Sequence, residues 1–400
     1  MRQLNVGLEK DKMNNMYFTE EHELFRKSLK DFLQKEVVPH IEKWESSGSI
    51  DRFIWEKFGG MGYFGLSTPE SYDGLDLDLF YTVILLEELQ KINSGGFAAA
   101  IWAHAYLAMT HLNKEANHEQ KVKYLQPSVM GRKIGCLCVT EPFGGSDVAG
   151  IRTKAEKRGD SYILNGSKTF ITNGVYCDYM IVAAKTTPNQ GNKGISLFIV
   201  DRNTDGVNVS KLDKLGWRAS DTAEISFDDV IVSESNLMGE VDKGFSYIMQ
   251  HFALERLIMG VNAHARAEFA LEYALQYMSE RSTFGKTINK YQALRHRFAD
   301  LHADMEICKT YNYAVTQKLN SGDYVVKEAT ISKLRSTKMA DEVVYECLQF
   351  LGGYGYMEEY PMARLFRDSR LGPIGGGTSE ILREIIAKIV IDKKDYKPIT

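Results

Sequence analysis

The sequence lacks the cysteine and histidine patterns that mark secreted and zinc-binding proteins. Among 400 residues it has five cysteines, an odd number with no CxxC pair: Cys136, Cys138, Cys177, Cys308 and Cys347. A disulfide framework is therefore excluded, and we expect reduced, structural thiols. No HExxH motif occurs and the nine histidines are scattered, so no metal site is expected.

Long apolar runs and an excess of basic charge are missing as well. No run is long enough to cross a bilayer, and the opening MRQLNVGLEKDKMNN has no apolar core of a signal peptide. Glu9 and Asp11 do not suit an organellar transit peptide. The formal net charge of -4 gives no reason to expect nucleic acid. We therefore expect no membrane span, no nucleic-acid partner, and a cytoplasmic, bacterial protein.

The residues that are present are those of an ordinary globular chain, with 44% hydrophobic and 26% charged residues. Helical periodicity gives way near Ile134 to short strand-like runs and returns from Lys243 onward. We predict an α+β protein with an N-terminal helical domain (1–133), a central antiparallel β domain (134–242) and a C-terminal four-helix bundle (243–400).

Polar and glycine-rich segments follow two predicted strands and precede the last predicted helix. TEPFGGSD offers Thr140 and Ser146, FITNG offers Thr172, and residues 375–377 are glycines before a helix that Thr378 can cap. Each segment alone is as well explained by a turn. Together they predict a long ligand with polar groups along it, such as a dinucleotide. The Rossmann motif GxGxxG between a strand and a helix is absent.

A further candidate, ERSTFGKTI, ends a long predicted helix. Arg281 can neutralise a pyrophosphate and Phe284 can cover an aromatic ring. A basic residue placed against the dipole of a helix C-terminus is the equal alternative.

Taken in order, TEPFGGSD, FITNG, ERSTFGKT, LGGYGYMEEYPMARLFRDSR and GGTSEI resemble the acyl-CoA dehydrogenase family. The resemblance runs from Phe18 to about Ile391. It is nearest to the long-chain members, through EEHELFRKSLKDF, GKTI and GYMEEYP. It implies FAD as the cofactor, an acyl-CoA thioester as the substrate, and a homo-oligomer, commonly a tetramer, whose subunits share cofactor sites.

The resemblance also implies roles for individual residues. Phe170, which replaces a tryptophan common at that position, and Thr172 lie beside the flavin ring, whereas Arg281 and Phe284 reach an FAD held mainly by another subunit. Arg256 lies near the CoA, with a surface ion pair as the alternative. The implied cofactor residues are Leu137, Val139, Thr140, Ser146, Phe170, Thr172, Arg281, Phe284, Gln349, Gly352, Gly353, Thr378 and Glu380, and the implied substrate residues are Ser146, Arg256 and Gly375.

The catalytic base is missing from the place where many members carry it, because that position is Gly376 here. In a minority of the family the glutamate lies on the first long helix of the C-terminal bundle, where this sequence has Glu255. If residues 244–280 are helical, Glu255 lies on an apolar side that should raise its pKa. The alternative is that Glu255 pairs with a neighbouring arginine at a helix interface.

These assignments predict the oxidation of a medium- to long-chain acyl-CoA to a trans-2-enoyl-CoA. Glu255 takes the α-proton, the N–H of Gly376 stabilises the carbonyl oxygen, flavin N5 accepts the β-hydride, and an electron-transferring flavoprotein receives the electrons. Phe97, Ile101 and Trp102 are candidates for the bottom of the acyl cavity. The alternatives are an isovaleryl or branched-chain dehydrogenase, an acyl-CoA oxidase, and a catalytically silent flavin- or CoA-binding protein.

Overall fold

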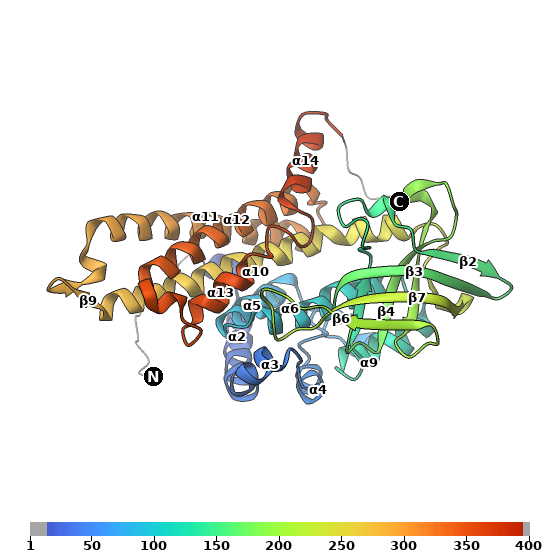
Figure 1. Ribbon diagram of the computed structural model, residues 1–400, viewed down its shortest axis with the longest axis horizontal. Helices are drawn as coiled ribbons and strands as arrows, with labels where there is room; N and C mark the ends of the chain where they lie inside the picture. The colour runs from blue at the N-terminus through green and yellow to red at the C-terminus, as the bar shows by residue number, and fades with distance from the viewer. Residues whose placement is uncertain (1–13, 395–400) are drawn as a thin grey trace.

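The computed structural model describes residues 14–394, so the opening stretch 1–13 lies outside the described residues. Helices form both ends of the described chain and a sheet forms its middle (Figure 1). The sheet lies at one end of an elongated molecule, and a long helix leads from it to the opposite end (Figure 1). The predicted α+β architecture is confirmed.

The N-terminal part begins with the helix predicted from Thr19. The Thr19 side chain accepts a hydrogen bond from the N–H of His22 (3.3 Å), and the His22 ring accepts one from the N–H of Thr19 (3.0 Å), which closes a capping box. The helices of this part are α1 (Asn14–Tyr17), α2 (Glu20–Phe32), α3 (Ile41–Ser47), α4 (Arg52–Gly60), α5 (Leu79–Lys91), α6 (Gly95–Ala103), α7 (Met109–Glu115), α8 (His118–Gln120) and α9 (Gln126–Val129).

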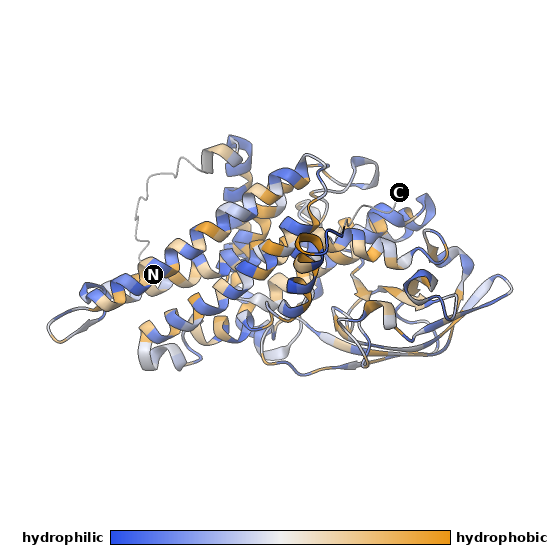
Figure 2. Ribbon diagram, turned by 90° about the horizontal axis from the view of Figure 1, so that it is seen from above, coloured by the Kyte–Doolittle hydropathy of each residue, from blue (hydrophilic) through white to orange (hydrophobic). Residues whose placement is uncertain are grey.

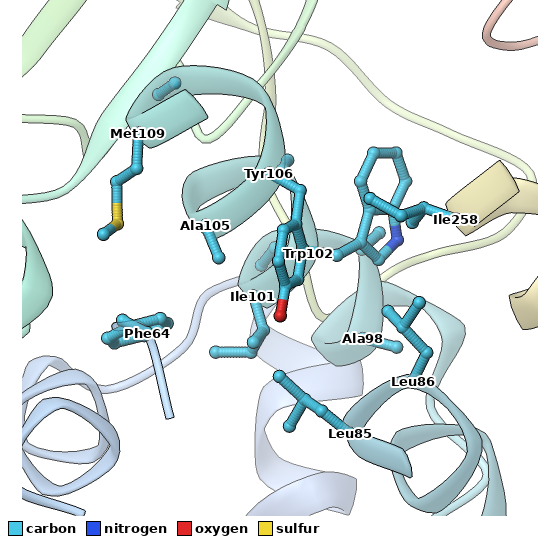
Figure 3. Close-up of a cluster of buried hydrophobic side chains, with 14 of the residues drawn as sticks. Phe64, Leu85, Leu86, Ala98, Ile101, Trp102, Ala105, Tyr106, Met109 and Ile258 are labelled. Carbon is cyan, nitrogen blue, oxygen red and sulfur yellow. The ribbon is translucent and has the colours of Figure 1, made fainter. Parts of the chain in front are cut away.

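The alanine-rich segment after Ser94 forms a buried helix. Ser94 caps α6 by accepting a hydrogen bond from the N–H of Phe97 (3.2 Å), and every residue of α6 is buried. A π-helical stretch over residues 104–108 then leads into α7. Ile101 and Trp102 lie in a buried cluster that also includes Ile258 of the long C-terminal helix (Figure 3). This cluster therefore joins the first helical part to the last.

The central sheet has the strand order β6–β7–β3–β2–β4–β5–β8, with β1 paired to β4. Its pairs are antiparallel except for β1–β4 and a short β2–β4 contact, which are parallel. Strand β2 was not predicted, because its sequence KAEKR is charged at every position but Ala155, and only Ala155 is buried. The strands are β1 (Gly135–Cys138), β2 (Lys154–Arg158), β3 (Ser161–Thr172), β4 (Tyr179–Lys185), β5 (Ile195–Asp201), β6 (Val207–Lys211), β7 (Thr222–Ser233) and β8 (Leu237–Met238).

The C-terminal part is organised by α10, whose 37 residues coincide with the predicted range 244–280. It packs against α5, α11 and α12, whereas α14 packs against α12 and projects away from the three long helices (Figure 1). The elements are α10 (Gly244–Glu280), β9 (Ser282–Thr283), β10 (Lys286–Thr287), α11 (Gln292–Asn320), α12 (Val326–Leu351), α13 (Pro361–Ser369) and α14 (Ser379–Val390).

Hydrophobic segments of the ribbon lie mainly where these elements face one another, and hydrophilic segments lie mainly on the outside (Figure 2). One apolar cluster joins the N-terminal helices, the adjoining face of the sheet and the first half of α10, and a second lies between α10, α11 and α12. Because α10 contributes to both clusters, its position is fixed along its whole length. Each helix within residues 14–394 is too short or too polar to span a bilayer.

Candidate active site

Glu255 and the glycine run meet in space. Glu255 lies about three turns after the start of α10. Its Oε1 atom lies 3.3 Å from the point where a Cβ on Gly376 would stand, and Met259 Sδ lies 2.3 Å from the same point. Met259 thus occupies the space that a side chain at position 376 would need. The carboxylate from α10 borders the same space.

The surroundings of Glu255 favour its neutral form. The residue is partly buried, and among residues 14–394 no cation forms an ion pair with it. Burial raises its pKa from 4.5 to about 7, while the positive charges of Arg256 and Lys333 act in the opposite direction. A carboxyl group that titrates near neutral pH is suited to accept and release a proton.

The glycine run has the backbone conformation expected from its sequence. Gly376 and Gly377 have φ angles of 60° and 92°, a region that other residues adopt only with strain. Thr378 Oγ1 then accepts a hydrogen bond from the N–H of Ile381 (3.4 Å) and caps α14. Within the described part of the chain, no carbonyl accepts a hydrogen bond from the N–H of Gly376. That N–H is available to a ligand oxygen.

Arg256 follows Glu255 but points toward α12. Its Nη1 atom donates to Thr330 Oγ1 (3.3 Å), and its guanidinium carbon lies 5.8 Å from the ring centre of Phe252. The residue is only 8% exposed. A surface ion pair, the alternative raised from the sequence, does not suit a buried side chain; the role near CoA stays a prediction.

The predicted flavin residues of the β domain gather where β1 and β3 end. The N–H of Thr169 donates to the carbonyl of Thr140 (2.9 Å), which joins the loop after β1 to β3. Nearby, the register between β3 and β7 shifts, and Phe170 has a φ of 60° with 69% of its surface exposed. An exposed ring on a strained backbone is typical of a functional site. In this group Val139 is buried, Leu137, Thr140 and Thr172 are partly buried, and Ser146 is exposed.

A buried ion pair that was not predicted from the sequence supports these strand ends. Lys168 Nζ lies 2.8 Å from Glu141 Oε1 and donates to the carbonyl of Val139 (3.2 Å). Glu141 also accepts hydrogen bonds from the N–H and hydroxyl of Thr153 (2.9 and 2.6 Å). The available signal was that Lys168 is separated by an even number of residues from Tyr162 and Leu164, which places all three on the same, inner face of the strand.

The other predicted cofactor residues gather at the far end of α10. A cavity of about 520 Å³ is lined by Arg281, Gln349, Gly352 and Gly353, among others. Open space surrounds the points where Cβ atoms on both glycines would stand, and Arg281 forms no ion pair within residues 14–394. A guanidinium, an amide and exposed backbone form a donor set that suits phosphate groups. Phe284, at the tip of the β9–β10 hairpin, is 98% exposed.

The structure does not bring all predicted residues together within one chain. Glu255 and Glu280 are 25 residues apart on one continuous helix, which corresponds to about 38 Å at 1.5 Å per residue. Arg281 follows directly, so the hairpin group lies far from Glu255, at the end of the molecule opposite the sheet (Figure 1). At the start of α14, Glu380 is exposed and pairs with Arg383 (3.0 Å).

Comparison with known proteins shows the family to which this chain belongs. Three family models match the chain: the acyl-CoA dehydrogenase N-terminal domain over residues 19–132, the middle domain over 136–230 and the C-terminal domain over 242–391. The mitochondrial long-chain specific acyl-CoA dehydrogenase of Sus scrofa is 38% identical over 94% of this chain and 88% of its own length. The chain belongs to the acyl-CoA dehydrogenase family.

One further relative and one solved structure are similar over nearly the whole chain. The mitochondrial isovaleryl-CoA dehydrogenase of Solanum tuberosum is 35% identical over 94% of this chain and 91% of its own length. The crystal structure of an acyl-CoA dehydrogenase from Geobacillus kaustophilus has a TM-score of 0.92 and 39% identity, over 94% of this chain and 99% of that one. Both long-chain and branched-chain acyl-CoA dehydrogenases are thus among the relatives.

Acyl-CoA dehydrogenases are FAD-dependent oxidoreductases, and this chain is one by membership. Its two groups of donors fit that cofactor. The strand ends offer hydroxyls and an exposed ring beside a strained backbone, and the hairpin cavity offers the guanidinium of Arg281, which lies 5.7 Å from the ring centre of Tyr354, beside open glycine backbone.

Proposed function

We propose that the protein oxidises fatty acyl-CoA thioesters of medium to long chain to trans-2-enoyl-CoA, with Glu255 as the base. The observation that carries this proposal is the approach of Glu255 Oε1 to within 3.3 Å of the Cβ position of Gly376. A base delivered there from α10 compensates for the missing side chain on the glycine run. This supports catalysis over a silent flavin-binding role.

The protein residues supply proton transfer and charge stabilisation. FAD, when bound, accepts the hydride from the β carbon. Glu255 takes the α-proton, and its raised pKa makes it a stronger base than an exposed glutamate. Negative charge then develops on the thioester carbonyl oxygen, where the free N–H of Gly376 can donate a hydrogen bond. The acyl chain would meet the apolar side chain of Trp102, which lines a small cavity together with Met259 and lies beside the buried Ile101 (Figure 3).

We also propose a homo-oligomer, a tetramer by the family resemblance, in which Arg281 and Phe284 of one subunit hold the FAD of another. The separation of about 38 Å along α10 supports this, because one chain cannot bring both groups to one cofactor. An electron-transferring flavoprotein then takes the electrons. We place the protein in a bacterial cytoplasm, as expected from the sequence.

The test is anaerobic addition of acyl-CoA to the FAD-loaded protein. Octanoyl-, lauroyl- and palmitoyl-CoA should bleach the flavin absorbance, and isovaleryl-CoA should do so poorly. An unchanged spectrum with every substrate would show binding without catalysis. Bleaching by isovaleryl-CoA alone would establish the branched-chain alternative, and peroxide formed in step with substrate loss in air would establish an oxidase.

Glu255→Gln should keep its FAD and slow the bleaching by about 10²–10⁴-fold, the usual contribution of a general base. Glu272→Gln is the matched control, because Glu272 lies on the same helix away from the glycine run. It should bleach at the rate of the unmodified protein. Rapid bleaching by Glu255→Gln would place the base elsewhere.

A further inference from the structure

A buried lysine lies beside the proposed base and was not singled out from the sequence. Lys333 belongs to α12, and none of its surface is exposed. Its Nζ atom donates a hydrogen bond to the carbonyl of Gly377 at 2.6 Å. A lysine ammonium group is rarely buried unless it is paired or functional. The contact with Gly377 therefore requires an explanation.

The charged groups around Lys333 come from two further helices. From α10, Glu255 attracts the ammonium group and Arg256 repels it, and from α14 Glu380 attracts it. Burial outweighs these charges and lowers the pKa of Lys333 to about 8. In return, Lys333 and Arg256 are the two cations whose charge favours ionised Glu255. Lys333 is the one of the two that also contacts the glycine run.

We propose that Lys333 is a positioning residue of the reaction, which anchors the glycine run at Gly377 and opposes the effect of burial by favouring the ionised form of Glu255. This rests on the proposed role of Glu255 as the base. The ammonium group thus acts on two groups of the reaction. It favours the ionised carboxylate that takes the proton, and it fixes the backbone whose Gly376 N–H faces the developing negative charge.

The anchoring part follows from the backbone. Gly376 and Gly377 both have positive φ, and glycine explores a wider range of conformations than any other residue. Without a fixed partner the direction of the Gly376 N–H would vary. A charge-assisted hydrogen bond to the next residue's carbonyl restricts that variation, because such bonds are shorter and stronger than neutral ones.

The electrostatic effect of Lys333 predicts in which direction the pH profile of kcat shifts when the lysine is removed. The base must be ionised, so activity falls as the pH drops through the pKa of Glu255, about 7. Removing the positive charge of Lys333 leaves Arg256 as the cation facing Glu255 and raises that pKa further. The acid limb of the kcat profile should therefore move to higher pH by about 1 unit.

The experiment compares pH profiles of kcat and KM in four holoenzymes: the unmodified protein, Lys333→Met, Lys333→Gln and Lys338→Met. Lys338 lies on the same helix but is exposed, so its variant should match the unmodified protein. Lys333→Met and Lys333→Gln should both show the shifted limb, and kcat should fall more than KM rises. FAD content and the melting temperature establish that each variant is folded.

A second measurement needs no substrate. The difference in melting temperature between a protein and its Glu255→Gln version changes with pH as Glu255 ionises. In the Lys333→Met or Lys333→Gln background that change should occur at higher pH. If folded variants show an unmoved transition and an unmoved acid limb, the role of Lys333 is wrong. If none of the acyl-CoA substrates bleaches the flavin of the unmodified protein, the proposed function is wrong, whatever the role of Lys333.

Discussion

At the scale of single residues, the candidate site depends on the fit between Gly376, Met259 and Glu255. A Cβ on residue 376 would stand 2.3 Å from Met259 Sδ, in a backbone with a φ of 60°. Two separate effects, steric overlap and backbone strain, therefore require glycine there. The consequence is that a side chain on residue 376 must displace Met259, and its Cβ would be in tight contact with Glu255 Oε1 at 3.3 Å.

Gly376→Ala should lower the free energy of unfolding by about 2–4 kcal/mol, the sum of left-handed strain and overpacking. It should also reduce the rate of flavin bleaching, because Met259 must move and the added methyl group crowds Glu255. Gly60→Ala is the control, since nothing lies within 4 Å of its Cβ position and its φ is not positive. Urea unfolding measures the free energy of unfolding of both variants, and that of the control should stay within about 0.5 kcal/mol of the unmodified protein. Equal effects of the two substitutions would contradict the packing argument.

Part of the arrangement around Gly376 could be predicted from the sequence. The missing side chain at position 376 directed attention to Glu255, and helical spacing placed Met259 on the same side of α10. Lys333 could not be found in this way. Its position along α12 does not reveal that it faces a carbonyl of the glycine run, because that contact joins residues 44 positions apart in the chain.

At the scale of elements, the buried pair of Lys168 and Glu141 fixes the strand ends where the flavin residues gather. Both side chains are almost fully buried, at 0% and 4% exposure. Removing one partner of such a pair leaves an uncompensated charge, whereas removing both does not. The pair therefore determines how well β1 and β3 stay aligned.

Lys168→Met or Glu141→Gln alone should lower the free energy of unfolding by about 3–5 kcal/mol and weaken FAD retention. The double variant should lose less than the sum of the two, and a double-mutant cycle measures that coupling. Lys157→Met is the control, because the Lys157–Glu234 pair is half exposed, at 53% and 45%, and should contribute less than about 1 kcal/mol. Additive losses at the buried pair would contradict the account.

The elements themselves were well predicted wherever the hydrophobic period was clear. The range of α10 was obtained from its periodicity, and six of the strands appeared as apolar or β-branched runs. β2 was missed because its outward face is charged and its pairing with β3 and β4, rather than its composition, makes it a strand. The buried state of Lys168 was missed for the related reason that tertiary pairing overrides the usual exposure of lysine.

At the scale of the whole molecule, α10 carries the proposed base near one end and leads to Arg281 at the other. About 38 Å separates Glu255 from the end of that helix. In the proposed oligomer each chain therefore supplies a base to one cofactor and a guanidinium to another. The sequence could indicate this sharing only through the family resemblance, since spacing along a chain does not reveal which copy a residue faces.

This arrangement predicts complementation between two inactive variants. Glu255→Gln lacks the base, and Arg281→Met lacks the cation of the hairpin cavity, so each alone should be nearly inactive. Subunits of the two, dissociated, mixed and reassembled with FAD, should regain bleaching in those sites that combine an intact base with an intact arginine. Size-exclusion chromatography with light scattering establishes reassembly. Mixed oligomers without any recovered activity would show that one chain forms a whole site.

The ring of Phe284 has a consequence for how the protein matures. A side chain 98% exposed at the tip of a two-residue turn gains nothing from folding of its own chain. In the proposed oligomer a neighbouring copy and its flavin cover this ring. Newly synthesised chains therefore expose an apolar side chain until they associate. A lack of flavin should then yield aggregates rather than stable monomers, and the yield of folded protein should depend more steeply on chain concentration than folding alone would require.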